Sequence, residues 1–295
     1  MPAIRLSVNV NKVATVRNSR GGREPDVLEA VRACLHAGAP GITVHPRADR
    51  RHITPEDVRA IAAELAAWRR GVEAADLRAQ PGGPHSGPAG GTERAAKGER
   101  VPRAGVRGGA PTEIELNIEG DPRPELLALV HEVRPDQCTL VPVAPGEITS
   151  QAGWAPATRR PDLPEIIQDL QGAGIRVSVF VDAEAEPIEW AASVGADRIE
   201  LYTEPFARAF EEGAAAAERS FARYVEAATL AHARGLGVNA GHDLDLHNLV
   251  LFRQLPHLDE VSIGHALISR AIFVGLEPVV REYLDVLAAA PSAAR

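Results

Sequence analysis

The sequence predicts an α/β fold in which eight parallel strands close into a single (β/α)8 TIM barrel spanning residues 1–295. Three observations predict it. Short apolar segments alternate with longer amphipathic segments along the chain. Phrases such as AGIRVSV and VGADRIEL place a glycine before an apolar run, as a helix C-cap does before a strand. The 295 residues, of which 45% are hydrophobic, are enough for one large core.

The individual elements follow from the local pattern. The expected strands are short runs of apolar and β-branched residues at 4–10, 41–45, 113–118, 137–141, 175–181, 197–201, 236–240 and 259–263. The expected helices are amphipathic segments at 26–37, 55–69, 123–133, 162–173, 185–194, 214–234, 245–253 and 266–289. Pro55 suits the first position of its helix, because the N–H that proline lacks has no helical partner there. An open, doubly wound sheet is the alternative, but no GxGxxG motif follows the first strand.

One segment interrupts the alternation. Residues 71–111 are rich in glycine, proline, arginine and alanine and contain almost no large apolar side chains. Such a segment buries too little apolar surface to offset the entropy lost on ordering. We interpret it as a flexible insertion between the second helix and the third strand, with a contact in an oligomer or with a partner as the alternative.

Composition excludes several classes of protein. The net charge of −8 argues against non-specific binding to nucleic acid. Cys34 and Cys138 have neither disulfide-framework nor zinc-site spacing, which suits a reducing cytoplasm. No apolar run is long enough to span a membrane, and no secretion signal is recognisable. The only lysines are Lys12 and Lys97, so a mechanism with an enzyme Schiff base would depend on one of them.

The stretch from Gly41 to Thr54 is the most informative part of the sequence. A buried strand ends there in two histidines and three arginines: His45, Arg47, Arg50, Arg51 and His52. A cluster of this kind is suited to binding an anion, although a solvated loop is the simple alternative for the adjacent pair of arginines.

Polar side chains also follow the other expected strands. In a (β/α)8 barrel the active site lies at the C-terminal ends of the strands, so these residues are expected to converge. They are Asn9, Asn11 and Lys12, then His45 and Arg47, Asn117 and Glu119, Glu147 and Thr149, Glu200, Asn239 and His242, and finally His265. Individually, Asn9, Asn117, Glu119 and His242 could simply satisfy local backbone groups.

Phosphate is the anion that the sequence favours. Gly264 and His265 open the last helix, whose free N–H groups and dipole suit a phosphate. The loop after the seventh strand, Gly241-His242-Asp243, is the other half of the usual barrel phosphate site. Together with the cluster around Arg47, this predicts two phosphorylated substrates or one bisphosphate.

Several motifs in one order resemble those of the pyridoxine 5'-phosphate synthase family. They are Thr15-Val-Arg-Asn-Ser-Arg-Gly21, Gly41 to Thr54, Asn117-Ile-Glu119, Leu140-Val-Pro142, Asn239-Ala-Gly-His242, His247-Asn248 and Ile263-Gly-His265. The resemblance implies a (β/α)8 barrel, usually a homo-octamer, that needs no metal or organic cofactor. It implies condensation of 3-amino-2-oxopropyl phosphate with 1-deoxy-D-xylulose 5-phosphate, with release of phosphate and water.

The resemblance also implies roles for particular residues. Glu119 and His45 would be general bases, His242 the proton donor and Glu200 a stabiliser of the transition state. The deoxyxylulose phosphate would be held by Arg47, His52 and Thr149, with Asn11 and Lys12 beside it. The amino-ketone phosphate would be held by Asn9, Arg20, Gly264 and His265, with Asp243 beside it.

This chain departs from the family pattern at three places. Asn11-Lys12 replaces the usual Asp-His, Asp243 replaces a glycine, and Val143-Ala144-Pro145 replaces a charged stretch. Two other readings therefore stay open. One is a divergent paralogue that binds a phosphorylated metabolite without turnover. The other is a metal-dependent barrel resembling sugar-phosphate epimerases, with His45, Glu119, Glu200 and His242 as ligands.

Overall fold

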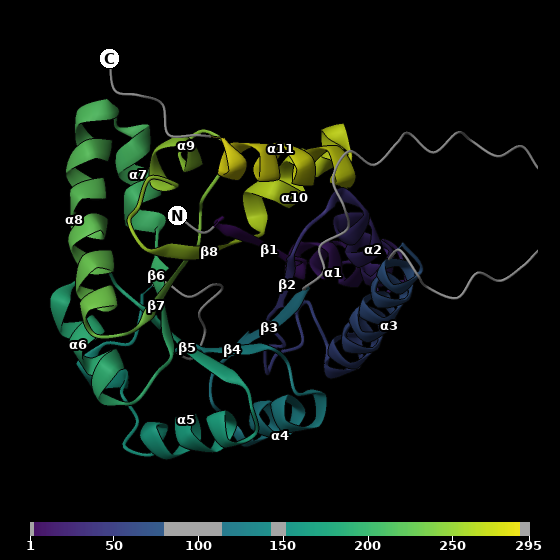
Figure 1. Cartoon of the computed structure of the whole chain (residues 1–295), viewed down its shortest axis with the longest axis horizontal. Coiled ribbons are helices and arrows are strands. Elements are labelled where there is room, and N and C mark those ends of the chain that lie inside the picture. The colour runs from purple at the N-terminus through teal and green to yellow at the C-terminus, as the bar shows by residue number, and fades with distance from the viewer. Residues whose placement is uncertain (1–2, 80–113, 143–151, 290–295) are drawn as a thin grey trace, which may run out of the picture.

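The computed structural model describes residues 3–79, 114–142 and 152–289, and its eight parallel strands form a closed barrel in which each strand pairs with its neighbours in the chain (Figure 1). The sequence prediction of a (β/α)8 barrel is therefore confirmed. The strands are β1 (Arg5–Asn9), β2 (Gly41–Val44), β3 (Glu115–Gly120), β4 (Gln137–Leu140), β5 (Arg176–Val181), β6 (Arg198–Tyr202), β7 (Gly237–Gly241) and β8 (Leu258–Ile263).

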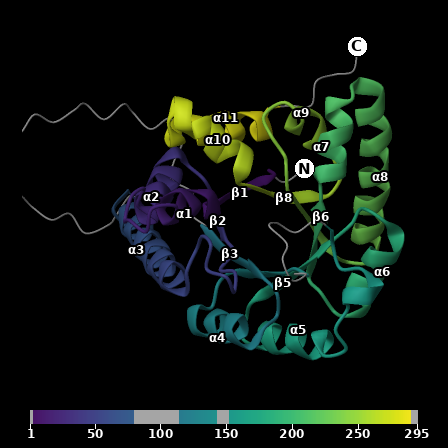
Figure 2. The ribbon, with the colours of Figure 1, turned by 180° about the vertical axis from the view of Figure 1, so that it is seen from behind.

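Helices surround the barrel, as the view from behind shows (Figure 2). They are α1 (Asn11–Asn18), α2 (Val27–Ala37), α3 (Pro55–Ala79), α4 (Pro124–Val133), α5 (Leu163–Gly172), α6 (Ala185–Ser193), α7 (Glu204–Glu211), α8 (Ala214–Ala233), α9 (Leu249–Phe252), α10 (His265–Val274) and α11 (Leu276–Ala288). One face of each long helix packs on the barrel, and residues such as Val31, Ile61 and Val280 are fully buried there. No helix in the described ranges has the length and apolar character needed to cross a membrane.

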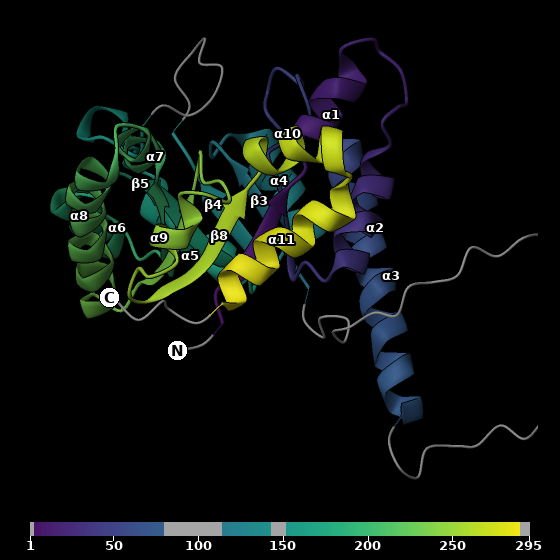
Figure 3. The same ribbon diagram turned by 90° about the horizontal axis from the view of Figure 1, so that it is seen from above.

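The helices differ from the sequence prediction in several places. The single helix expected at 266–289 is divided into α10 and α11 by Gly275, whose φ of +95° is incompatible with a continuous helix. Helices α1 and α7 were not predicted, and α9 is shorter than the segment 245–253. Helix α3 continues through Ala79, into the segment predicted to be an insertion, and projects beyond the other helices (Figure 3). The rest of that predicted insertion, 80–111, lies outside the described residues.

The interior of the barrel is polar, whereas the layer between strands and helices is apolar. Ser7 and Thr43 are hydrogen-bonded through their hydroxyl groups at 2.6 Å, and Thr139 Oγ1 donates to Asn117 Oδ1 at 3.0 Å. Asn117, one of the predicted strand-end residues, is thus part of this interior network. These hydrogen bonds join side chains of four successive strands, β1 to β4, inside the barrel.

Glu260 of β8 lies within this interior and is only 3% exposed. Burial, together with the charge of Glu115, raises its pKa to about 7. The stability that its neutral form gives the fold is present below the ordinary carboxyl pKa and is lost as pH rises through about 7. We expect Glu260→Gln to reduce this loss in urea unfolding followed across that pH range. The exposed variant Glu165→Gln is the control, and a pH profile unchanged by Glu260→Gln would contradict the assignment.

Candidate active site

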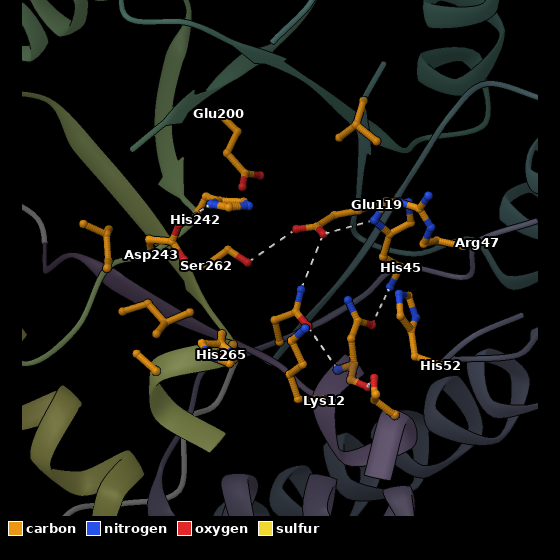
Figure 4. Close-up of a pocket in the computed structure, with 18 of the residues that line it drawn as sticks. Lys12, His45, Arg47, His52, Glu119, Glu200, His242, Asp243, Ser262 and His265 are labelled. Carbon is orange, nitrogen blue, oxygen red and sulfur yellow. Dashed lines mark hydrogen bonds and ion pairs between the residues drawn. The ribbon is translucent and has the colours of Figure 1, made fainter. Parts of the chain in front are cut away.

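A cavity of about 430 Å³ opens at the C-terminal ends of the strands (Figure 4). Its lining comes from most of the strand ends and the loops that follow them. The lining residues are Asn9, Asn11, Lys12, Thr15, His45, Arg47, Arg51, His52, Glu119, Val141, Phe180, Glu200, His242, Asp243, Leu244, Ser262, Ile263, Gly264, His265 and Ala266. Polar residues from several strand ends therefore converge here, whereas Asn117 and Asn239, which were also expected to do so, are not among the lining residues.

One predicted site residue, Arg20, is not brought to this cavity. Arg20 is exposed just beyond α1 and is not among the lining residues. Thr149 lies outside the described residues. Conversely, the lining includes Ser262, which was not predicted. The alternation of Glu260 and Ser262 along β8 is the sequence signal that could have indicated an inward polar face.

Asn9 and Asn11 hold the cavity wall together. Asn9 Oδ1 accepts the backbone N–H of Asn11 at 3.0 Å, and its Nδ2 lies 3.5 Å from Glu119 Oε2. Asn11 Oδ1 accepts the backbone N–H of His45 at 2.9 Å. Both asparagines therefore have a structural function in addition to lining the cavity.

The arginine-rich loop after β2 is anchored by α1. Arg17 forms a bidentate ion pair with Asp57, at 2.6 and 2.8 Å, and Asp57 also accepts the backbone N–H of Thr54. The next residue, Asn18, donates from Nδ2 to the carbonyl of His52 at 2.8 Å. Residues of the motif from Thr15 to Gly21 therefore hold the loop after β2 in place. They fix the loop that carries Arg47, whose side chain is largely buried.

His45 is an uncharged imidazole at neutral pH. Burial and the positive charges of His52, Arg47 and Arg123 lower its pKa to about 3. Its Nδ1 lies 3.9 Å from Glu119 Oε2, and its buried Nε2 has no hydrogen-bond partner among the described residues. A buried nitrogen without a partner is unfavourable unless a ligand supplies one. His45 is therefore arranged to exchange a hydrogen bond or a proton with a bound molecule.

Glu119 and Glu200 face the cavity from β3 and β6 (Figure 4). Burial raises the pKa of Glu119 to about 7, within the range useful to a general base. Burial and the negative charge of Glu119 raise the pKa of Glu200 well above its ordinary value. Two neighbouring carboxyl groups with raised pKa values are typical of acid–base sites.

The loop after β7 brings His242 to the opposite side of the cavity from His45. Gly241 precedes it, and a Cβ at this position would lie 2.3 Å from Glu200 Oε1. A side chain at position 241 would therefore displace the Glu200 carboxyl group from its present position. His242 Nδ1 lies 2.9 Å from Asp243 Oδ2.

Helix α10 begins at the cavity, with Gly264 at its N-cap and His265 as its first residue. The N-terminus of a helix offers unpaired N–H groups and a positive dipole to an anion. A Cβ on Gly264 would lie 3.0 Å from Asn9 Cβ and 3.1 Å from the Asn9 carbonyl. The glycine thus permits the close approach of α10 to the end of β1.

We expect Gly264→Ala to weaken phosphate binding at this helix start, because the added methyl must displace Asn9 or the first turn of α10. The expected loss of affinity is about tenfold, from a shift worth roughly 1.4 kcal/mol. Isothermal titration with a phosphorylated ligand measures it. Gly172→Ala is the matched control, since a Cβ there meets no atom within 4 Å. Unchanged affinity in Gly264→Ala would contradict a ligand at this helix start.

The metal-dependent alternative can be compared with the geometry. Within residues 3–79, 114–142 and 152–289, no group of three or more histidine, cysteine, aspartate or glutamate side chains could hold a metal ion. The four ligands which that alternative requires, His45, Glu119, Glu200 and His242, therefore do not form a coordination group.

The family match and the similar proteins of known sequence point to the same family. Residues 6–76 and 109–289 match the family described as "Pyridoxal phosphate biosynthesis protein PdxJ". The pyridoxine 5'-phosphate synthase of Porphyromonas gingivalis is 44% identical over 285 residues, covering 96% of this chain and 99% of the relative. That of Cytophaga hutchinsonii is 45% identical over 281 residues, covering 95% and 97%.

More distant solved structures share the barrel. The 3-hexulose-6-phosphate synthase of Salmonella typhimurium has a TM-score of 0.53 at 11% identity, covering 96% of this chain and 98% of that one. A phosphoribosylanthranilate isomerase of Thermotoga maritima has a TM-score of 0.50 at 12% identity, covering 97% and 100%. At such identities the likeness shows the fold alone.

Proposed function

The chain belongs to the PdxJ family of pyridoxal phosphate biosynthesis proteins, and we propose that it is a pyridoxine 5'-phosphate synthase. In this proposal it condenses 3-amino-2-oxopropyl phosphate with 1-deoxy-D-xylulose 5-phosphate and releases phosphate and water. One observation supports it most strongly. A single cavity holds a neutral imidazole and two buried carboxyl groups, together with arginine side chains and the N-terminus of α10.

The two ends of the cavity suit two phosphate groups. Arg47, with Arg51 and His52 beside it, would hold the deoxyxylulose phosphate. The start of α10 at Gly264 and His265 would hold the amino-ketone phosphate. The predicted contributions of Arg20 and Thr149 stay predictions.

The groups between these ends suit successive proton transfers. The substrate supplies the amine that attacks the ketone, so imine formation needs no enzyme lysine. Loss of water and ring closure then require protons to be removed from carbon and delivered to oxygen. Glu119 and His45 would remove them, and His242 would deliver them. Each well-placed acid or base contributes about 10²- to 10⁴-fold to the rate.

Glu200 has a different role in this scheme. Burial and the negative charge of Glu119 raise its pKa well above the ordinary value, which favours the protonated form that can donate a hydrogen bond. A carboxylic acid kept neutral by burial can stabilise negative charge that develops on oxygen. We propose that Glu200 stabilises the transition state in this way.

We also propose an oligomeric state, a location and a cofactor requirement for the enzyme. The family resemblance predicts a homo-oligomer in the cytoplasm that takes small phosphorylated substrates without a cofactor. Size-exclusion chromatography with light scattering measures the oligomer, and activity of metal-stripped protein tests the cofactor prediction.

Incubation with both substrates tests the function. Mass spectrometry should detect pyridoxine 5'-phosphate only when both are present. The alternative of a binding paralogue is favoured by Lys12 and Asp243, which depart from the family pattern inside the cavity. That alternative predicts heat of binding for a phosphorylated ligand but no product.

A further inference from the structure

His242 and Asp243 form a side-chain pair at the rim of the cavity (Figure 4). His242 Nδ1 lies 2.9 Å from Asp243 Oδ2, and the two side chains are 22% and 41% exposed. The imidazole also packs edge-on against the ring of Tyr202, with centroids 5.0 Å apart. The carboxylate thus contacts the ring at one nitrogen, and the aromatic contact restricts its tilt.

The backbone is constrained so that this pair can form. His242 and Asp243 have φ angles of +86° and +60°, a region that residues other than glycine seldom adopt. Two buried side chains donate hydrogen bonds to carbonyl groups of this turn. Thr203 Oγ1 donates to the carbonyl of Gly241 at 2.8 Å, and Asn248 Nδ2 donates to the carbonyl of Asp243 at 3.0 Å. Backbone strain of this kind is commonly associated with functional sites.

We propose that Asp243 is a positioning residue that holds the Nδ1 proton of His242, so that the ring exchanges protons with a ligand through Nε2. Which imidazole nitrogen carries the proton is set by the hydrogen bond that the other nitrogen makes. The same logic lets a carboxylate orient the histidine of a hydrolase triad. The proposal rests on the proposed function for the identity of the ligand.

This assignment replaces an interpretation based on charge alone. On charge alone, Asp243 would repel a phosphate bound at the start of α10, and Lys12 would neutralise it. Within the described residues, no ion pair within 4.0 Å joins these two side chains, and the carboxylate of Asp243 is bonded to His242 instead. That hydrogen bond is the largest cause of the lowered pKa of Asp243, whereas His265 and Lys12 act only through their charges.

The tautomer of His242 tests the proposal without any substrate. Long-range ¹H–¹⁵N NMR spectra at alkaline pH distinguish imidazoles protonated on Nδ1 from those protonated on Nε2, and the signal lost in His242→Asn assigns the residue. We expect the Nδ1–H form in the wild type and in Asp243→Asn, whose amide oxygen can accept the same bond. In Asp243→Gly we expect a shift toward the Nε2–H form. An Nε2–H tautomer in the wild type, or the same tautomer in Asp243→Gly, would overturn the proposal.

Kinetics and stability separate positioning from a structural role. Asp243→Gly relieves the positive φ, so its thermal midpoint should equal or exceed that of the wild type. Its kcat should nevertheless fall about two- to fivefold, the range expected for a half-exposed charge pair, with KM little changed. Asp243→Asn should recover part of that loss. An Asp243→Gly enzyme with wild-type kcat would contradict a positioning role.

Asp169→Asn is the matched control, because Asp169 forms a similar surface pair with His131 at 2.6 Å, on residues that do not line the cavity. It should leave kcat unchanged. Failure of the wild type to form product would overturn the proposed function, whereas the NMR result would still decide the role of Asp243.

Discussion

Replacement of Glu119 by glutamine is expected to lower kcat by about 10²- to 10⁴-fold, the range that one well-placed general base contributes. Glutamine keeps the shape of the side chain and can still bond to Asn9 and Ser262, which lie 3.5 and 3.4 Å from the carboxylate oxygens. It cannot accept a proton. Steady-state kinetics with both substrates measure the loss, and binding of each phosphorylated substrate should change little.

The pH profile gives a second test of the same residue. Because burial raises the pKa of Glu119 to about 7, its basic form disappears as pH falls through that value. Wild-type turnover should therefore decline on the acidic side of about 7, and the residual turnover of Glu119→Gln should lack that decline. The exposed variant Glu165→Gln serves as the control. Near-normal turnover in Glu119→Gln would reduce Glu119 to a structural carboxyl group at the end of a strand.

Replacement of His242 by asparagine is expected to have an effect of similar size, about 10²- to 10⁴-fold in kcat, because it removes the proposed proton donor. His247→Asn is the matched control, since this exposed histidine follows in the same loop but does not line the cavity. Calorimetry should show that both phosphorylated substrates still bind to His242→Asn. A variant that binds normally and turns over at the wild-type rate would exclude the donor role.

The His242→Asn variant also tests whether Asp243 acts through His242. If the carboxylate acts through the imidazole, Asp243→Gly should cause no further loss of kcat once His242 is asparagine. Two groups that act as a unit are non-additive in a double-mutant cycle. Strictly additive losses would mean that Asp243 influences turnover by another route.

The barrel could be predicted from the sequence because its signals are local. Each strand is a short apolar run next to a turn or helix cap, and such runs can be recognised without knowledge of their partners. The break between α10 and α11 was missed because the apolar pattern continues across Gly275, although Gly275 followed by Pro278 is a helix-end signal and its φ of +95° interrupts the helix. Helix α1 was missed because its sequence, NKVATVRN, has little amphipathic pattern.

The position of the site could also be predicted, because parallel strands in a barrel bring their C-terminal ends together. The electrostatics of the site could not be predicted from the sequence. The lowered pKa of His45 depends on burial and on arginines from two different loops, Arg47 and Arg123. The pairing of His242 with Asp243 accompanies two unusual φ angles, in a turn that Thr203 contacts from the end of β6. These are tertiary effects that residue spacing does not encode.

The most direct test of the proposed synthase activity is a stoichiometric assay of the wild type and Glu119→Gln with both substrates. Pyridoxine 5'-phosphate is quantified by mass spectrometry and inorganic phosphate by a colorimetric method. We predict that the wild type forms the two products in equal amounts, that omission of either substrate abolishes both, and that Glu119→Gln forms little of either. Binding of both substrates without formation of pyridoxine 5'-phosphate by the wild type would contradict the account and favour a binding protein.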